Sequence, residues 1–371
     1  MAGTFTATDA DFADGATIAG FATVKLTDAE LVNEEDGAIE IRGGSTEFIR
    51  KGTGTGDTYG EAMTAAYEDA EENEKTTYKA MGTLTIADSD LGDSNIVDFA
   101  TVSITDSLVG SISVNEENSA KATVTFAGSN DAGTVAYING VTVKNGDTAI
   151  DAYIGTAGND TISVNAGAAL TVDGTMNFGE GNDRATVNGV LRAVGWIDEV
   201  TDSLAISGSG AVAVTGELYD AAKEAWRNFS VAGSVELINA GSETALRAIR
   251  TRKEELADNT ASGARKLPGD DEVEMNGWLS GVKDNGQFED LEDWISFKYQ
   301  AGCAYDITCE EVESFKVELC QGGKTIKNGI VENEGVFSVD TSKLSVGTDY
   351  QLRLTTEKGQ EAFAYCVTAI A

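Results

Sequence analysis

The sequence predicts an all-β protein, in which an irregular parallel β-solenoid with one or two short helices precedes a C-terminal β-sandwich. Small and β-branched residues alternate with Asp and Asn, as in TVSITDS and KATVTFAG, which is the period-two pattern of half-buried strands. The 371 residues contain 42 glycines and one proline, Pro268, so turns are frequent. A long segment also occurs twice. Together these features predict many short strands arranged in repeated units.

The repeated segment begins at Gly3 as GTFTATDADFADGATIAGFATVKLTDA and again at Gly82 as GTLTIADSDLGDSNIVDFATVSITDS. With one residue deleted, the two copies align along their whole length. WIDEVTDSLAISG, from Trp196, is a weaker third copy. Repeats of this kind predict stacked units, each of which buries its apolar row only against a neighbour. An acidic segment between the first two copies is expected to leave the stack, either as an excursion that is partly helical near Glu61 to Glu72 or as a long hairpin.

The repetitive domain is expected to span residues 1–258 and to end in a helix near 242–258. The segment SETALRAIRTRKEELADN has Ser242 as a candidate N-cap and Glu243 in the first turn. Leu246, Ile249 and Leu256 fall on one face of such a helix. The helix would cover the end of the solenoid, with its arginines paired to nearby acidic side chains.

Composition changes after this helix. Residues 259–276 are small and polar and include the only proline, so they are predicted to form a linker. Residues 277–371 contain a series of strands that starts with WLSGVKD, WISFKYQAG and AYDITCEE. Seven or eight short strands with turns between them are typical of a β-sandwich.

The charge of the chain limits its partners. The net charge of −36 comes from 62 acidic and 26 basic residues. Nucleic acid and anionic membranes would be repelled, whereas cations are favourable partners. The absence of histidine removes the commonest general base and transition-metal ligand. Hard-cation sites built from carboxylate, amide and carbonyl oxygens are still available. No stretch approaches 18 apolar residues, so no membrane span is expected.

Two stretches place G-N-D before an alternating strand: GTAGNDTISV from Gly155 and FGEGNDRATV from Phe178. They resemble the RTX, or haemolysin-type, calcium-binding repeat, whose pattern is G-G-x-G-x-D-x-U-x. The resemblance implies a β-roll-like calcium site within residues 155–187, in which two turns face one another. Its ligating turns would be formed by Gly155, Gly158, Asp160, Gly179, Gly181 and Asp183. Each copy lacks one glycine of the pattern, so solenoid turns that bind no calcium are the competing interpretation.

The longer repeats resemble those of large, repetitive bacterial surface proteins, which implies a surface location and a scaffold role. The start, MAGTFTATDADF, does not have the pattern of a signal peptide. A fragment of a longer chain, a signal already removed and an export signal at the C-terminus are all compatible with it.

The last domain resembles the bacterial pre-peptidase C-terminal domain. The resemblance depends on Asp290 and Asp293 before an aromatic strand, an Ala301–Gly302 turn, a Leu344-x-x-Gly347-Thr348 segment and the final strand around Tyr365. It implies a jelly-roll-like β-sandwich that accompanies a larger secreted protein and, in some members of the family, binds calcium or glycans. Asp290 and Asp293 would then be calcium ligands. The alternative is that they are charged residues on a solvated strand entry.

All four cysteines, Cys303, Cys309, Cys320 and Cys366, lie in this domain. A hairpin of CAYDITC and FKVELC would bring Cys303 opposite Cys320, but four cysteines allow three pairings, and free thiols are an equal alternative.

We therefore expect an extracellular, calcium-stabilised structural or adhesive module of an adhesin, a surface layer or a matrix fibre. Its partners would be calcium ions and either a second copy or a cell-surface or glycan partner. A calcium-dependent, polysaccharide-active β-helix enzyme and a glycan-binding sandwich using Trp278 or Trp294 are the alternatives. Neither G-x-S-x-G nor H-E-x-x-H occurs, and a histidine-dependent triad is impossible, so we do not expect an enzyme.

Overall fold

The computed structural model describes residues 3–13, 15–32, 38–43, 80–114, 121–195, 197–200, 203–215, 229–232, 234–240, 242–268, 272–282, 289–310, 312 and 314–370. Of these described residues, 58% lie in strands and 4% in helices, so the fold is all-β, as predicted. The predicted acidic excursion and its helix lie outside the described residues. The chain divides into two compact units, of which the second contains residues 189–194, 209–226 and 233–371. None of the described helices is long and apolar enough to cross a membrane.

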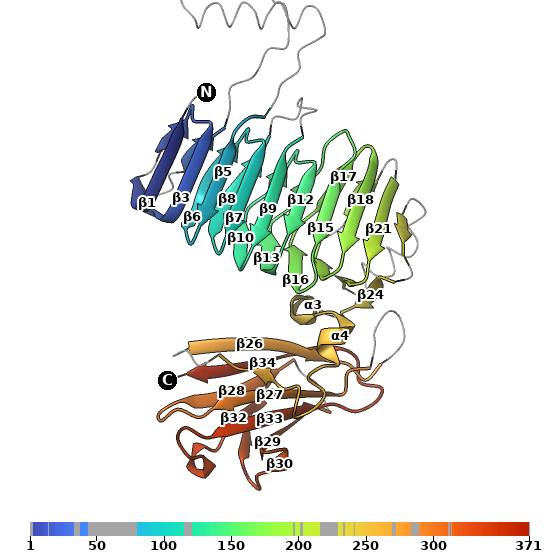
Figure 1. Cartoon of the computed structure of the whole chain (residues 1–371). Coiled ribbons are helices and arrows are strands. Elements are labelled where there is room, and N and C mark those ends of the chain that lie inside the picture. The colour runs from blue at the N-terminus through green and yellow to red at the C-terminus, as the bar shows by residue number, and fades with distance from the viewer. Residues whose placement is uncertain are drawn as a thin grey trace, which may run out of the picture. The chain divides into compact units, whose positions relative to one another are not determined.

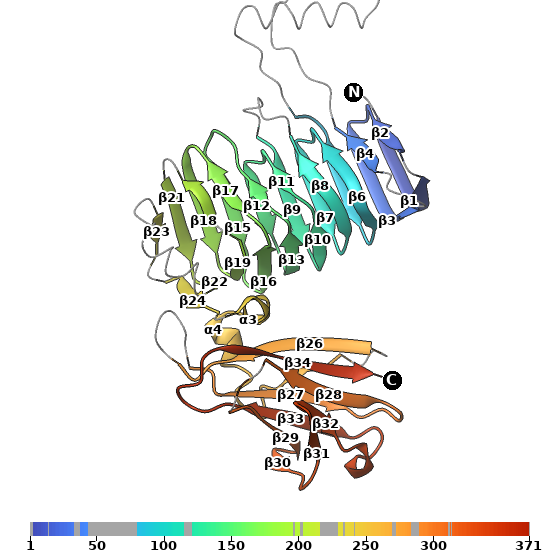
Figure 2. The same ribbon diagram turned by 180° about the vertical axis from the view of Figure 1, so that it is seen from behind.

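The first unit is a parallel β-solenoid with three faces, and the solenoid has about eight turns (Figures 1 and 2). The first face consists of β1 (Thr4–Ala13), β3 (Thr23–Val32), β5 (Thr83–Ala87), β7 (Thr101–Thr105), β9 (Thr123–Ala127), β12 (Gly140–Val143), β15 (Thr161–Val164), β18 (Asn182–Val187), β21 (Ser203–Gly208) and β23 (Phe229–Val231). The second face continues from the ends of β1 and β3 through β6 (Asp90–Val97), β8 (Leu108–Ser113), β10 (Asn130–Ala132), β13 (Gly146–Ile150) and β16 (Ala168–Val172). The third face consists of β2 (Thr17–Ala19), β4 (Ile39–Arg42), the ends of β6 and β8, β11 (Val135–Ala136), β14 (Tyr153–Ile154), β17 (Met176–Gly179) and β20 (Ile197–Val200).

Alternation in the sequence forms the core of the solenoid. In β5, β7 and β9 every second residue is buried and the residues between face outward. Leu84 pairs in register with Val102, which pairs with Val124, so apolar side chains form continuous rows along the stack. Each fully buried side chain of this size contributes about 1.5–3 kcal/mol of stability. This contribution depends on the neighbouring coils, because a single coil cannot cover its own apolar row.

The internal repeat corresponds to the coil. The copy at Gly3 begins at β1 and the copy at Gly82 begins at β5, and each runs through one coil into the first strand of the next. Asp9 and Asp88 occupy the same point in the two copies, and both have left-handed backbone conformations, with φ of 49°. The prediction of stacked repeating units is therefore confirmed.

The second unit begins with a short parallel ladder of β19 (Val190–Ala193), β22 (Ala211–Val214) and β24 (Glu236–Asn239). Two helices follow, α3 (Glu243–Ala248) and α4 (Arg252–Glu255). Ser242 caps α3, because its Oγ accepts a hydrogen bond from the Ala245 amide. The side chain of Arg192 donates two hydrogen bonds to the Ile249 carbonyl, at 3.1 and 2.9 Å.

The rest of the second unit is a sandwich of two five-stranded sheets. The first sheet has the order β25 (Arg265–Lys266), β27 (Glu292–Lys298), β33 (Asp349–Thr355), β29 (Lys316–Gln321) and β30 (Lys324–Thr325). The second has the order β26 (Glu272–Leu279), β34 (Phe363–Ile370), β28 (Ala304–Cys309), β32 (Val336–Val339) and β31 (Ile330–Asn333). Pairing is antiparallel except between β25 and β27. A 3-10 helix, η2 (Thr341–Lys343), precedes β33.

Two sequence-based expectations for this unit need correction. The hairpin that would bring Cys303 and Cys320 together is wrong, because β28 and β29 belong to different sheets; all four cysteines are free thiols. Residues 259–276, predicted to be a linker, contain β25, which pairs with β27. Leu267 of this segment is 2% exposed and packs in the core of the sandwich, because its apolar side chain continues the buried face of the first sheet.

Candidate metal centre

Asp290 and Asp293, the predicted calcium ligands of the sandwich, lie beside and within the first residues of β27. Both side chains are fully buried, with 0% exposure. Asp290 is fixed by two backbone hydrogen bonds with Ser280, of 2.7 and 2.8 Å. The alternative interpretation, a charged strand entry on a solvated face, is therefore wrong.

Two further carboxylates reach the same place from α4 and the turn after it. Glu255 and Asp258 are 0% and 1% exposed. The Asp258 carbonyl accepts a hydrogen bond of 2.9 Å from the Trp294 amide, which ties this turn to β27. One carboxylate oxygen from each of Glu255, Asp258 and Asp293 lies within 4.8 Å of the others. We call Glu255, Asp258, Asp290 and Asp293 the acidic cluster.

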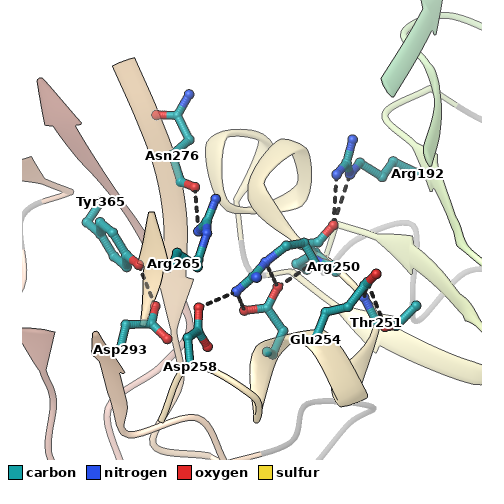
Figure 3. Close-up of polar contacts among 11 residues, drawn as sticks. Arg192, Arg250, Thr251, Glu254, Asp258, Arg265, Asn276, Asp293 and Tyr365 are labelled. Atoms are coloured by element: carbon teal, nitrogen blue, oxygen red, sulfur yellow. Dashed lines mark hydrogen bonds and ion pairs between the residues drawn. The ribbon is translucent and has the colours of Figure 1, made fainter. Parts of the chain in front are cut away.

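One guanidinium and one phenol contact the acidic cluster (Figure 3). Arg250 binds both oxygens of Glu255, at 3.0 and 2.9 Å, and Oδ2 of Asp258 at 2.7 Å. Tyr365 donates a hydrogen bond of 2.5 Å to Oδ2 of Asp293. A single guanidinium cannot balance four carboxylates, so ionisation of all four would leave negative charge buried.

Several oxygens of the cluster have no hydrogen-bond partner among the described residues. These buried atoms are Oδ1 of Asp258, Oδ1 of Asp293 and Oδ1 of Asn259. Both oxygens of Asp290 also lack a hydrogen bond of good geometry among the described residues, although the Asn259 side chain lies close enough to lower the pKa of this carboxyl. Leaving one buried polar atom without a partner costs about 1–3 kcal/mol, and more for a charged group. Such a concentration of acceptor oxygens is costly when the carboxylates are ionised, and either protonation or a cation would relieve that cost.

The pKa values of the acidic cluster are raised, as the burial and crowding of its carboxyl groups would suggest. Burial and the charge of Glu255 raise the pKa of Asp290 to about 8. Burial and the charge of Asp290 raise the pKa of Asp293 well above its usual range. Burial also raises the pKa of Glu255, although Arg250 opposes this effect. Without a cation, the site favours protonated carboxyl groups.

The donor set fits a hard divalent cation. Four carboxylates and the Asn259 amide oxygen offer the oxygen ligands that Ca²⁺ prefers, of which it takes six to eight. Neither a histidine nor a cysteine belongs to the donor set, and soft thiolate or imidazole ligands are what Zn²⁺ and copper would need. Arg250 and Tyr365 do not contact every oxygen of the acidic cluster. Asp258, Asp290 and Asp293 keep oxygens that could bind the ion.

The two G-N-D turns are brought together in a different way. Thr161 after the first turn pairs in register with Arg184 after the second, so the turns stack on one corner of successive coils. Each coil has three strands here, and one full coil accounts for the 23 residues between Asp160 and Asp183. The predicted residues are thus adjacent, but they do not face one another across a gap.

Both turn carboxylates bind backbone amides. Asp160 accepts hydrogen bonds from the Thr156 amide, at 2.7 Å, and the Thr156 hydroxyl, at 2.9 Å. Asp183 accepts one of 2.8 Å from the Asp160 amide. Both side chains are buried, at 1% and 2% exposure. Burial raises the pKa of Asp160, although the bonds from Thr156 oppose the rise. The carboxylates fix the corner in the described structure.

The glycines of these turns permit close stacking. A Cβ at Gly181 would collide with the carbonyl oxygen of Gly158, and one at Gly179 would collide with that of Thr156. Gly179 and Gly181 also have positive φ values of 72° and 128°. Contact between coils therefore explains these glycines without a bound ion.

Sequence reasoning misses Glu255 and Asp258. The available signal is the segment EELADN, which the sequence pattern places in a capping helix whose arginines pair with acids. That pairing occurs, because Arg250 binds Glu255 and Asp258. The helix, however, breaks into α3 and α4, and the break turns the two acids towards β27.

Comparison with known proteins gives no family. No family model matches the sequence, and no curated protein matches it. Among solved structures, a crystal structure of Salmonella Typhimurium PliG, a periplasmic lysozyme inhibitor of g-type lysozyme, covers 29% of this chain and 96% of its own. The two are 14% identical with a TM-score of 0.20, and at this level the likeness gives no information about fold or function.

Proposed function

We propose that the chain is a calcium-stabilised structural module of an extracellular surface protein, with its ion site in the acidic cluster. The observation that carries this proposal is the set of buried carboxylates, of which Asp258, Asp290 and Asp293 retain oxygens without a hydrogen bond of good geometry to any described residue. A bound Ca²⁺ would neutralise them and join α4, the turn at Asp258 and β27. Ion binding would then stabilise the folded sandwich by mass action.

The structural role is supported by the solenoid and by the charge. A stack of short, registered strands provides rigid length, and its faces suit adhesion or assembly. The 62 acidic residues suit an environment rich in cations, which relieve self-repulsion. An adhesin, a surface layer or a matrix fibre would use both properties.

Thermal unfolding tests the proposal directly. Melting curves are measured by circular dichroism in EGTA, in millimolar Ca²⁺ and in millimolar Mg²⁺. We expect a calcium-specific increase in Tm; at a hundredfold excess over Kd the ion adds about 2.7 kcal/mol to the free energy of unfolding. Terbium luminescence sensitised by nearby aromatic rings then reports binding of a Ca²⁺ analogue to the site.

Paired variants locate the ion. Asp290→Asn with Asp293→Asn should abolish both the calcium response and the terbium signal. The matched pair Asp160→Asn with Asp183→Asn should keep both. A response lost only in the second pair would move the site to the G-N-D turns. A wild-type protein with no response to Ca²⁺ would refute the proposal.

A further inference from the structure

The first face of the solenoid presents two registered columns of outward-facing residues on β1, β3, β5, β7, β9, β12, β15, β18 and β21. The first column is Thr4, Thr23, Thr83, Thr101, Thr123, Gly140, Thr161, Arg184 and Ala205. The second is Thr6, Lys25, Thr85, Ser103, Thr125, Thr142, Ser163, Thr186 and Ser207. Every one of these residues is exposed or half-buried. We call these eighteen residues the hydroxyl face.

The composition of the hydroxyl face differs from that of the rest of the molecule. Fourteen of the eighteen are Thr or Ser, none is acidic and none is aromatic. Strand propensity alone favours Thr on an open strand, but it does not exclude acids. The second face of the same coils has a registered column of Asp11, Glu30 and Asp90. In a chain with 62 acidic residues, the hydroxyl face thus contains no acidic residue, and Lys25 and Arg184 are its only charged residues.

The columns form a regular lattice. Neighbouring strands of a sheet lie about 4.8 Å apart, and alternate residues of a strand lie about 6.7 Å apart. The register of this face continues from β1 to β21 without a shift. β-Branched threonine has few χ1 rotamers, so its hydroxyl and methyl are already positioned. The strip therefore offers two rows at fixed spacing in which most positions carry a hydroxyl, with interruptions at Gly140, Arg184, Ala205 and Lys25.

The area, charge and periodicity of the hydroxyl face limit what it can bind. At about 32 Å² for each outward residue, the eighteen residues cover roughly 600 Å², which is less than the roughly 800 Å² that each partner buries in a stable protein complex. The net charge of −36 opposes a second copy. A soluble small ligand needs a concave site that buries most of its surface. A periodic strip without acidic residues or aromatic rings instead fits an uncharged and periodic solid. Ice is such a solid, because its surface presents rows of water oxygens that form hydrogen bonds with hydroxyl groups. We propose that the hydroxyl face binds ice, with hydroxyls in place of lattice waters and methyls in the gaps between them.

Inhibition of ice recrystallisation tests this proposal with the full chain in buffer containing Ca²⁺. The wild type should inhibit recrystallisation and, when fluorescently labelled, should be incorporated into a growing ice crystal. Thr101→Tyr combined with Thr123→Tyr adds two rings in the middle of the strip and should abolish both effects. Thr17→Tyr adds the same ring to an exposed outward position on the third face and should leave both unchanged. Melting curves of all variants establish that each is folded.

A wild type that neither inhibits recrystallisation nor enters ice would overturn the proposal. A folded double variant that keeps full activity would overturn it as well, and so would loss of activity in Thr17→Tyr. If the double variant does not fold, Thr125→Val replaces it: the loss of one hydroxyl with the shape retained should reduce the activity, and full activity counts against the hydroxyl face. Binding of the wild type to crystalline cellulose or chitin, but not to ice, would assign the strip to a solid polysaccharide instead.

Discussion

The backbone amide of Asp160 donates a hydrogen bond of 2.8 Å to Oδ1 of Asp183, the aspartate at the same corner of the next coil. Asp183, which the sequence suggests as an ion ligand, thereby accepts the hydrogen bond of a buried backbone amide. Removal of such an acceptor leaves the donor without a partner, whether or not calcium is present.

Asp183→Ala is expected to reduce the free energy of unfolding by about 1–3 kcal/mol, by the same amount in EGTA and in Ca²⁺. Urea unfolding measures this difference. Asp151→Ala removes an exposed carboxylate from the same solenoid and should change stability by less than about 0.5 kcal/mol. A loss seen only in Ca²⁺ would contradict the capping role of Asp183.

Gly181→Ala should destabilise the solenoid by about 2–4 kcal/mol, from strain at positive φ and from overlap with the Gly158 carbonyl. Gly167 is the matched control, because its φ is +75° but a Cβ there would meet nothing within 4 Å. Gly167→Ala should reduce the free energy of unfolding by only about 1–2 kcal/mol, because the alanine must adopt a left-handed conformation. Equal costs in the two variants would show that stacking does not require the glycine.

The acidic cluster predicts an unusual pH dependence without calcium. The pKa of Asp290 is raised to about 8 from an ordinary value of 3.8, so between these values the folded chain holds more protons than the unfolded chain. The free energy of unfolding in EGTA should therefore decrease as pH rises from about 4 to 8. Saturating Ca²⁺ should weaken this slope, because the ion favours the ionised carboxylates. Urea titrations at several pH values measure the slope, which Asp290→Asn should reduce; an increase in stability over this range in EGTA would contradict the prediction.

Arg250→Gln removes the guanidinium that binds Glu255 and Asp258. In EGTA the free energy of unfolding should decrease by about 3–5 kcal/mol, because two buried carboxylates lose their partner. In Ca²⁺ the loss should be smaller, since the ion supplies positive charge in its place. Arg247→Gln is the control: its pair with Glu243 is exposed and contributes about 0.3–0.5 kcal/mol. A loss for Arg250→Gln that is independent of calcium would argue against an ion in the cluster.

Local patterns predict the elements well. Alternation in TVSIT and TVTFA corresponds to β7 and β9, because a strand with one buried face has a period of two wherever it lies. Ser242 is recognisable as an N-cap from its neighbours alone. Asp290 and Asp293 are identifiable as candidate ligands, but nothing local indicates that both are fully buried.

The order of apolar and polar residues, the repeat at Gly3 and Gly82 and the absence of histidine were sufficient to specify stacked strands and to exclude many kinds of site. These properties depend on neighbours in the chain, so the sequence contains them directly. The acidic cluster depends on Glu255 and Asp293, which are 38 residues apart in the sequence but have carboxylate oxygens within 4.8 Å. Only tertiary packing brings them together, because the break between α3 and α4 and the pairing of β25 with β27 fix where the turn at Asp258 lies. The same packing buries the carboxylates and raises their pKa values, an effect that depends on desolvation and on neighbours that no local pattern specifies.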